Sequence, residues 1–330
     1  MKKYTLKKPP VQEKPEAPSV PKRFSINYHN ELNPAQYDAV TSVNGPHLII
    51  AGAGTGKTRT ITYRVAYLVE LGVKPESILL LTFTRRAASE MLRRATMLLD
   101  ARCEKVAGGT FHSFANLVLR QYAPLIKFDS SFTILDQGDA EDVVNLLRTT
   151  MKVDTRERRF PRKQTLFDIF SKSVNTQQSL KQILKEEYPH FEEYLEEIAV
   201  LHKAYELYKA KHNLMDYDDL LLYLRKLLRD HDHVRLTLSD RYKYIMVDEY
   251  QDTNRIQAEI VSLLALKHNN IMVVGDDSQS IYSFRGATIR NILEFPEDFH
   301  GCKVIKLEEN YRSTQPILNL TNEILRRARD

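Results

Sequence analysis

One short stretch, AGAGTGKT at residues 51–58, constrains the fold of this chain more than any other. It follows the apolar run HLII and precedes RTITYRVAYLVEL, so a strand, a glycine-rich loop and a helix are expected in that order. Glycines let backbone N–H groups converge on an anion at the start of the helix, as in a P-loop. Ala51 stands where that motif usually has its first glycine. The predicted phosphate-binding loop consists of Ala51, Gly52, Ala53, Gly54, Thr55, Gly56, Lys57 and Thr58. In it Lys57 reaches the β- and γ-phosphates, and the Thr58 hydroxyl binds Mg²⁺.

Short apolar runs alternate with helical patterns along most of the chain. Continuous apolar runs of this kind are typical of strands that are buried on both faces of a parallel sheet. Strands are expected at residues 47–50, 78–83, 244–247, 270–274 and 303–307. The predicted fold class is therefore α/β, with a parallel sheet and helices on its faces.

Between residues 117 and 213 the strand pattern gives way to helical periodicity. Apolar residues from Phe191 to Tyr208 recur at helical spacing, and glutamates occupy the opposite face. We expect an all-helical subdomain at residues 117–213. It would interrupt an α/β domain that is split between residues 26–116 and 214–312.

Composition restricts the setting in which the chain can act. The net charge is only +5, from 48 basic and 43 acidic residues, so any nucleic-acid site must be built locally. The two cysteines, Cys103 and Cys302, lie far apart, which argues against a disulfide framework and suits a reducing compartment. No apolar run approaches the roughly 20 residues that span a bilayer. Residues 1–25 are rich in proline and basic residues and lack the apolar core of a signal peptide. We expect a flexible tail on a cytoplasmic protein without membrane partners.

A pair of carboxylates follows one of the predicted strands. Asp248 and Glu249 come directly after the run YIMV, at the strand end where ligands of open α/β sheets bind. Such a pair alone is common at solvated strand ends, but a phosphate-binding loop needs an acidic partner. The pair predicts that Asp248 holds Mg²⁺, and that Glu249 orients and deprotonates an attacking water.

Eight stretches in order resemble motifs of the UvrD/Rep/PcrA family of superfamily-one DNA helicases, over residues 32–314. Besides AGAGTGKT and DEYQD, the matching stretches are LNPAQ (32–36), LTFTRRAASEM (81–91), GTFHS (109–113), MDYDDLL (215–221), VVGDDSQSIYSFRGA (273–287) and LEENYRST (307–314). The resemblance implies a RecA-like P-loop NTPase domain. It also implies ATP and Mg²⁺ as cofactors, and single-stranded DNA and single-strand/duplex junctions as partners. In family terms the activity is 3′ to 5′ translocation in repair or replication, with a nucleoid association.

The family's ATP-contacting residues carry over to positions of this chain. Gln36 resembles the amide that contacts the adenine edge, and Gln279 the γ-phosphate sensor. Arg285 resembles an arginine that supports the catalytic carboxylates. Arg312 resembles one that reaches the γ-phosphate, Tyr311 the ring that stacks on adenine, and Arg59 a second face of that stack. A fixed guanidinium fork stabilises charge on a transferring phosphoryl group, and an aromatic face holds a flat base.

The family's DNA contacts carry over in the same way, to Phe83, Thr84, Arg85, Thr110, His112, Tyr217, Tyr282 and Phe284. The rings would stack on bases, which tolerates any base sequence and contributes about 1–3 kcal/mol per base. The chain departs from the family in having Phe284 where tryptophan is more frequent, and Arg85-Arg86 where Asn-Lys is usual. A purely structural role stays open for Phe83, His112, Tyr282 and Phe284.

The family also has a second motor domain after the NYRST motif, and it does not fit in the residues that remain. Residues 313–330 are expected to start a helix leading to that absent domain. We therefore expect this chain to be a fragment of an ATP-dependent DNA helicase, and we expect the fragment alone to be slow or inactive in ATP hydrolysis. The alternatives are an ATP- and DNA-binding module with little turnover and an unrelated P-loop enzyme such as a kinase or GTPase.

Overall fold

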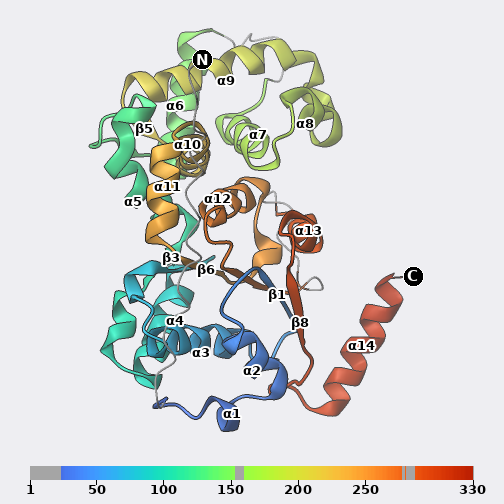
Figure 1. Cartoon of the computed structure of the whole chain (residues 1–330). Helices are drawn as coiled ribbons and strands as arrows, with labels where there is room; N and C mark the ends of the chain where they lie inside the picture. Colours follow the sequence, from blue (N-terminus) through green and yellow to red (C-terminus); the bar gives the residue numbers. More distant parts are fainter. Residues whose placement is uncertain (1–23, 153–159, 277–278, 280–286, 330) are drawn as a thin grey trace, which may run out of the picture.

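The computed structural model describes residues 24–152, 160–276, 279 and 287–329. Its six-stranded sheet has the order β3-β2-β6-β7-β1-β8, and every pair of neighbouring strands is parallel (Figure 1). The strands are β1 His47–Ala51, β2 Ile78–Thr82, β3 Ala107–Thr110, β6 Tyr244–Val247, β7 Ile271–Gly275 and β8 Lys303–Leu307. The predicted α/β class with a parallel sheet is confirmed.

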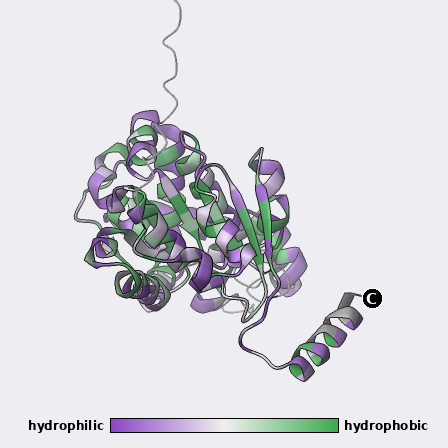
Figure 2. Ribbon diagram, turned by 60° about the horizontal axis from the view of Figure 1, so that its bottom comes forward, coloured by the Kyte–Doolittle hydropathy of each residue, from purple (hydrophilic) through white to green (hydrophobic). Residues whose placement is uncertain are grey.

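Helices cover both faces of this sheet, because side chains alternate between two cores along each strand. Leu48 and Val273 belong to one core, while Ile49 and Val274 belong to the other. The first core packs against α5 (Phe111–Tyr122), α10 (Tyr217–Asp230), α11 (Asp232–Arg241), α12 (Arg255–Ala265) and α13 (Arg290–Asp298). The second core packs against α2 (Pro34–Thr41), α3 (Lys57–Glu70) and α4 (Arg85–Leu98). In Figure 2 the hydrophobic colour gathers in the strands between these layers.

The strand pattern and the structure differ in three places. β3 was not expected, because its sequence AGGT has two glycines and no large apolar residue. β2 ends at Thr82, which leaves Phe83 in the loop that follows. β8 lies at the sheet edge and exposes Lys303, Val304 and Lys306, so it is not buried on both faces as the pattern predicted.

Four helices form a unit with a core of its own, drawn above the sheet in Figure 1. They are α6 (Gln137–Thr150), α7 (Lys163–Thr176), α8 (Leu180–Glu187) and α9 (Leu195–Lys211), and we call them the helical unit. Ile198, Leu201 and Tyr205 of α9 are buried in this core, as the helical spacing indicated. Two short strands, β4 (Thr133–Ile134) and β5 (Leu214–Met215), pair in parallel between the chain's entry to the unit and its exit.

Short 3-10 turns connect several of these helices and strands. The 3-10 turns are η1 Pro75–Ser77, η2 Ala101–Lys105, η3 Ala123–Ile126, η4 Pro189–Tyr194 and η5 Tyr250–Asp252.

Residues 1–23 of the expected tail lie outside the described residues, but Phe24 stacks on Tyr67 beside helix α1 (Tyr28–Glu31). Among the described helices, none is long and apolar enough to cross a membrane.

The last helix, α14 (Gln315–Arg329), projects away from the rest of the molecule (Figures 1 and 2). Its apolar residues Ile317, Leu320 and Ile324 are each more than half exposed. Because they share one helical spacing, they form an apolar stripe in contact with solvent.

Candidate functional site

The predicted motifs gather at one edge of the sheet. Each of the six strands runs directly into one of them at its carboxyl end: residues 52–58 follow β1, 83–86 follow β2, 111–113 follow β3, 248–252 follow β6, Asp276 follows β7 and 308–312 follow β8. Because parallel strands all end at the same edge, motifs that are far apart in the chain become neighbours.

The glycine loop has the backbone that only glycine adopts easily. Gly54 has φ 83° and Gly56 has φ 92°, and α3 begins at Lys57 directly after the loop. A Cβ atom on Gly56 would lie 2.6 Å from Gln36 Nε2, and one on Gly54 would lie 2.6 Å from Arg312 Cβ. The missing side chains therefore allow Gln36 and Arg312 to approach the loop closely.

The segment after β8 is hydrogen-bonded to this loop. Tyr311 N–H donates to Gly54 O at 2.9 Å, and Asn310 Nδ2 donates to Ala53 O at 2.6 Å. Asn310 Oδ1 accepts from Arg312 N–H at 2.9 Å, so it also shapes the turn that carries Arg312. Sequence reasoning missed Asn310, although it lies beside two selected residues in the NYRST stretch.

Substituting Gly54 by alanine tests whether this close approach matters. Any alanine in this backbone region costs about 1–2 kcal/mol, and here its Cβ would also displace the segment bearing Arg312. We expect Gly54→Ala to weaken ATP binding about tenfold or more, as the loss of a charge-assisted hydrogen bond of about 1.5–3 kcal/mol would. Gly45→Ala is the matched control, because Gly45 has φ 86° but nothing within 4 Å of its added Cβ. Titration with a fluorescent ATP analogue measures both variants, and equal affinities would contradict the expectation.

The residues selected for the base of the nucleotide lie together beside the loop. Gln36 is buried, donating from Nε2 to Thr55 O at 3.1 Å and accepting from Asn33 N–H at 3.4 Å. Tyr311 is 62% exposed, and its hydroxyl accepts from Asn33 Nδ2 at 2.9 Å. Asn33 thus contacts both residues, a role that the sequence did not indicate.

Arg59 is held on the same side of the loop. Its Nη2 donates to Glu31 O at 2.8 Å and to Glu31 Oε2 at 3.1 Å, and its guanidinium lies 4.5 Å from the Tyr63 ring centre. Sequence reasoning also missed Glu31. Arg59 and Tyr311 are the residues predicted to stack on the two faces of adenine. Arg59 is held by protein contacts, and the Tyr311 ring is largely exposed.

Glu249 lies next to the P-loop lysine. Lys57 Nζ donates to Glu249 Oε2 at 2.9 Å, and Gln251 Nε2 donates to the same oxygen at 3.0 Å. Glu249 has φ 52°, the left-handed region that side chains rarely adopt, which is a conformation that surrounding contacts must maintain. Gln251, missed from sequence, also accepts from Asp276 N–H at 3.0 Å and so joins the ends of β6 and β7.

Asp248 is a buried carboxylate with an unused oxygen. Its Oδ1 is buried and has no hydrogen-bond partner among the described residues. Burial, and then the charge of Glu249, raise its pKa to about 7. A buried oxygen without a partner fits a cation ligand. No cluster of three or more His, Cys, Asp or Glu suited to a metal occurs in the described part of the chain. That Asp248 and Thr58 hold Mg²⁺ stays a prediction.

The segment after β7 is described only in part. Gln279 N–H donates to Asp276 O at 3.1 Å, and its side-chain amide donates to the Asp276 carboxylate. Since Asp276 also contacts Gln251, Gln279 connects through these two residues to Glu249. Arg285, Tyr282 and Phe284 lie outside the described residues.

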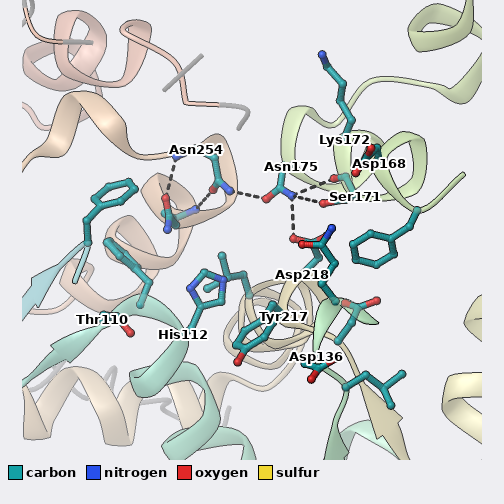
Figure 3. Close-up of a pocket in the computed structure, with 18 of the residues that line it drawn as sticks. Thr110, His112, Asp136, Asp168, Ser171, Lys172, Asn175, Tyr217, Asp218 and Asn254 are labelled. Carbon is teal, nitrogen blue, oxygen red and sulfur yellow. Dashed lines mark hydrogen bonds between the residues drawn. The ribbon is translucent and has the colours of Figure 1, made fainter. Parts of the chain in front are cut away.

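Four of the residues selected for DNA line one cavity of about 780 Å³ (Figure 3). These are Phe83, Thr110, His112 and Tyr217, and the His112 and Tyr217 rings meet edge to face at 5.9 Å. Burial lowers the pKa of His112, which favours a neutral ring. Thr84 and Arg85 begin α4 at the exposed surface and do not line the cavity.

Tyr217 is positioned by buried charges. It is the first residue of α10, and the flanking Asp216 and Asp219 form the cap of that helix. Lys209 of α9 lies 2.5 Å from Asp216 Oδ2 and 2.6 Å from Asp219 Oδ2, and Tyr205 donates to Asp216 at 2.9 Å. Because all these partners are buried, the start of α10 is fixed to the helical unit, while Tyr217 itself stays 52% exposed.

The cavity and the glycine-loop site share one loop. The cavity lies between the sheet edge and the helical unit, and its lining includes Asp252 at the end of turn η5. Gln251 Nε2, which donates to Glu249, lies 3.2 Å from Asp252 Oδ2. The loop after β6 therefore has the Lys57 ion pair at its start and the cavity at its end.

Comparison with known proteins adds an independent finding. The family model described as the UvrD/REP helicase N-terminal domain matches residues 32–300. The chain is 37% identical over 298 residues to the ATP-dependent DNA helicase PcrA of Staphylococcus aureus (strain Mu50), covering 90% of the chain and 40% of that protein. It is 38% identical over 296 residues to the PcrA of Staphylococcus epidermidis (strain ATCC 35984), covering 89% and 40%. The chain spans about 40% of the length of these curated relatives.

Proposed function

This chain belongs to the UvrD/REP helicase family, and on that premise we propose that it is the part of a DNA helicase that binds ATP and single-stranded DNA. The ATP site is the glycine loop with the segments after β6, β7 and β8. The DNA site is the cavity lined by Phe83, Thr110, His112 and Tyr217. In the whole protein we propose ATP-driven translocation along single-stranded DNA in the 3′ to 5′ direction, acting at single-strand/duplex junctions.

The observation that supports this proposal best is the shared loop after β6. Glu249 contacts Lys57 at one end of the loop, and Asp252 borders the cavity at the other. A strand of DNA in the cavity and a triphosphate on the glycine loop would both act on this one short segment. Coupling of hydrolysis to movement requires such an element, whose position both ligands can bias.

The residues around the triphosphate have separate tasks in this proposal. Lys57 leaves Glu249 for the phosphates, which frees the Glu249 carboxylate to accept a proton from the attacking water. Gln279 and Arg312 contact the γ-phosphate, and the Arg312 guanidinium stabilises charge as the phosphoryl group transfers. Asp248 and Thr58 would hold Mg²⁺, whose charge offsets that of the phosphates when it is bound.

Binding and turnover measurements on the 330-residue chain test the proposal. We expect it to bind ATP in preference to GTP, to bind a thymidine oligonucleotide, and to hydrolyse ATP faster when that oligonucleotide is present. Preference for GTP would favour an unrelated P-loop enzyme. Binding of both ligands without any hydrolysis would favour a binding module without motor activity.

Tyr217 provides a direct test of the DNA site. Its exposed ring faces the cavity, and loss of one stacked base costs about 1–3 kcal/mol, or about 5- to 150-fold in affinity. We expect Tyr217→Ala to weaken binding of a thymidine oligonucleotide within that range, with Tyr217→Phe restoring most of it. Tyr37→Ala is the control, because Tyr37 is an exposed tyrosine on α2 that does not line the cavity. An unchanged affinity in fluorescence anisotropy for Tyr217→Ala would place the DNA elsewhere.

The setting of the protein follows from the same proposal. We propose a cytoplasmic, nucleoid-associated protein whose partners are repair or replication proteins. The proposed helical subdomain of residues 117–213 interrupts the motor domain of residues 26–116 and 214–312. Hydrolysis by the 330-residue chain is expected to be slower than that of its curated relatives, of whose length it spans about 40%. DNA unwinding by this chain at the speed of a whole helicase would contradict that expectation.

A further inference from the structure

One asparagine in the cavity wall joins the helical unit to the sheet domain. Asn175 lies near the end of α7, and its Nδ2 donates to Asp218 Oδ1 on α10 at 2.8 Å and to Ser171 O at 2.9 Å (Figure 3). Its Oδ1 accepts from Asn254 Nδ2 at 2.8 Å. Both ends of the amide are thus engaged, and rotating the amide by half a turn would place donor against donor and acceptor against acceptor.

Asn254, the partner of Asn175, ends the loop that carries Glu249. It is the N-cap of α12, where its Oδ1 accepts from Gln257 N–H at 2.9 Å and its own N–H donates to Gln257 Oε1 at 2.9 Å. The preceding residue, Thr253, accepts through its backbone oxygen from Asn291 Nδ2 at 2.9 Å. The far end of the loop is therefore held from two sides, with Asn175 supplying the contact to the helical unit.

Asp218, the other partner, follows Tyr217 in the first turn of α10, and both residues line the cavity. Burial, and then the neighbouring Asp216, raise the pKa of Asp218 to about 6. Because this value is still below neutral pH, the carboxyl group that accepts the Asn175 hydrogen bond is mostly ionised there. A base that stacks on Tyr217 would lie next to this carboxylate. The hydrogen bonds from Asp218 through Asn175 to Asn254 therefore begin next to Tyr217, the ring proposed to stack on a DNA base. They end at the loop that carries Glu249.

We propose that Asn175 is a positioning residue that transmits occupancy of the cavity by single-stranded DNA to the loop bearing Glu249. This inference rests on the proposed function, since it takes the cavity as the DNA site. Glu249 has a backbone conformation that needs support from its surroundings. Asn254, at the far end of the same loop, is held both by its cap contacts with Gln257 and by Asn175. Displacing a catalytic group by about 1 Å can cost about 10²-fold in rate, so a small shift is sufficient.

The test compares ATP hydrolysis with and without a saturating thymidine oligonucleotide, in single turnovers of the 330-residue chain. We expect Asn175→Ala to reduce the ratio of the two rates by about 10- to 100-fold. A merely structural role would lower both rates together and leave their ratio unchanged. Asn145→Ala, on α6 of the helical unit and outside the cavity, is the matched control and should keep the wild-type ratio.

A second variant separates the hydrogen bond between Asn254 and Asn175 from the cap of α12. Asn254→Ser retains a side-chain oxygen that caps α12 but lacks the amide donor to Asn175. We expect it to reduce the ratio as Asn175→Ala does, and the double variant to reduce it no further, because both changes break the same hydrogen bond.

Each outcome has a distinct meaning. A wild-type chain that binds neither ATP nor the oligonucleotide overturns the proposed function. A wild-type chain that binds both, but whose hydrolysis does not respond to the oligonucleotide, overturns this inference and leaves the nucleotide site standing. Retention of the full ratio by Asn175→Ala, or additive losses in the double variant, overturns the role of Asn175 alone.

Discussion

Glu249→Gln is expected to reduce single-turnover ATP hydrolysis by about 10²- to 10⁴-fold, the contribution of a positioned general base. The amide keeps the shape of the side chain but cannot accept a proton from water. Lys57 at the same time loses its ion pair, which joins Nζ to Glu249 Oε2 at 2.9 Å. Because Lys57 is then free for the phosphates, ATP affinity is expected to stay the same or increase.

A lower hydrolysis rate together with an unchanged or higher ATP affinity distinguishes a general base from a residue that only binds ATP. Glu308→Gln is the control, an exposed carboxylate directly after β8 at the same edge of the sheet. Quench-flow or long-time single-turnover measurements give the rate, and titration with a fluorescent ATP analogue gives the affinity. A Glu249→Gln variant that hydrolyses ATP at the wild-type rate would remove Glu249 from the reaction.

Asp248→Asn is expected to stabilise the ligand-free protein at pH 8 while abolishing its use of Mg²⁺ with ATP. Asp248 is 5% exposed, and its Oδ1 has no hydrogen-bond partner among the described residues. Burial, and then the charge of Glu249, raise its pKa from the ordinary 3.8 to about 7. A change of this size corresponds to about 4 kcal/mol at most, on the order of several degrees in Tm.

The pH dependence has a definite sign. A carboxyl group whose pKa is raised in the folded protein binds more protons there than in the unfolded chain. Its stabilising contribution is therefore complete below about pH 4 and lost as the pH rises through about 7. We expect the stability advantage of Asp248→Asn to be largest at pH 8 and to shrink toward pH 5.

Thermal unfolding at several pH values, without Mg²⁺ or nucleotide, measures this difference. Asp139→Asn is the control, an exposed aspartate in the first turn of α6, and should leave the pH profile of the wild type unchanged. Adding ATP with Mg²⁺ should raise the Tm of the wild type more than that of Asp248→Asn. An Asp248→Asn variant less stable than the wild type at pH 8 would mean that the carboxylate is stabilised by contacts in the ligand-free fold.

Much of the fold and the family could be predicted from the sequence alone. Apolar runs such as HLII and YIMV have to be buried, and their regular spacing between helical patterns indicated a parallel sheet. The family resemblance drawn from ordered motifs is confirmed by the match to residues 32–300. Strand β3 escaped prediction, because AGGT carries no apolar signal and becomes a strand only by pairing with β2.

The contacts of the candidate site were less predictable than its motifs. Asn33, Gln251 and Asn310 each join two segments through side-chain amides. All three lie inside predicted motifs, but a motif does not indicate which distant segment an amide will contact. Asn175 is the extreme case, since its partners Asp218 and Asn254 belong to other helices.

Local sequence determined which backbone forms the loop at residues 51–58 and which apolar runs become strands, since these depend on neighbours in the chain. Only the tertiary structure decided that Lys57 pairs with Glu249 and that the cavity of Tyr217 borders the same loop. The order β3-β2-β6-β7-β1-β8 brings β6 and β7 between β1 and β2. Contacts across that order depend on distances between folded elements, and no local pattern in the chain encodes them.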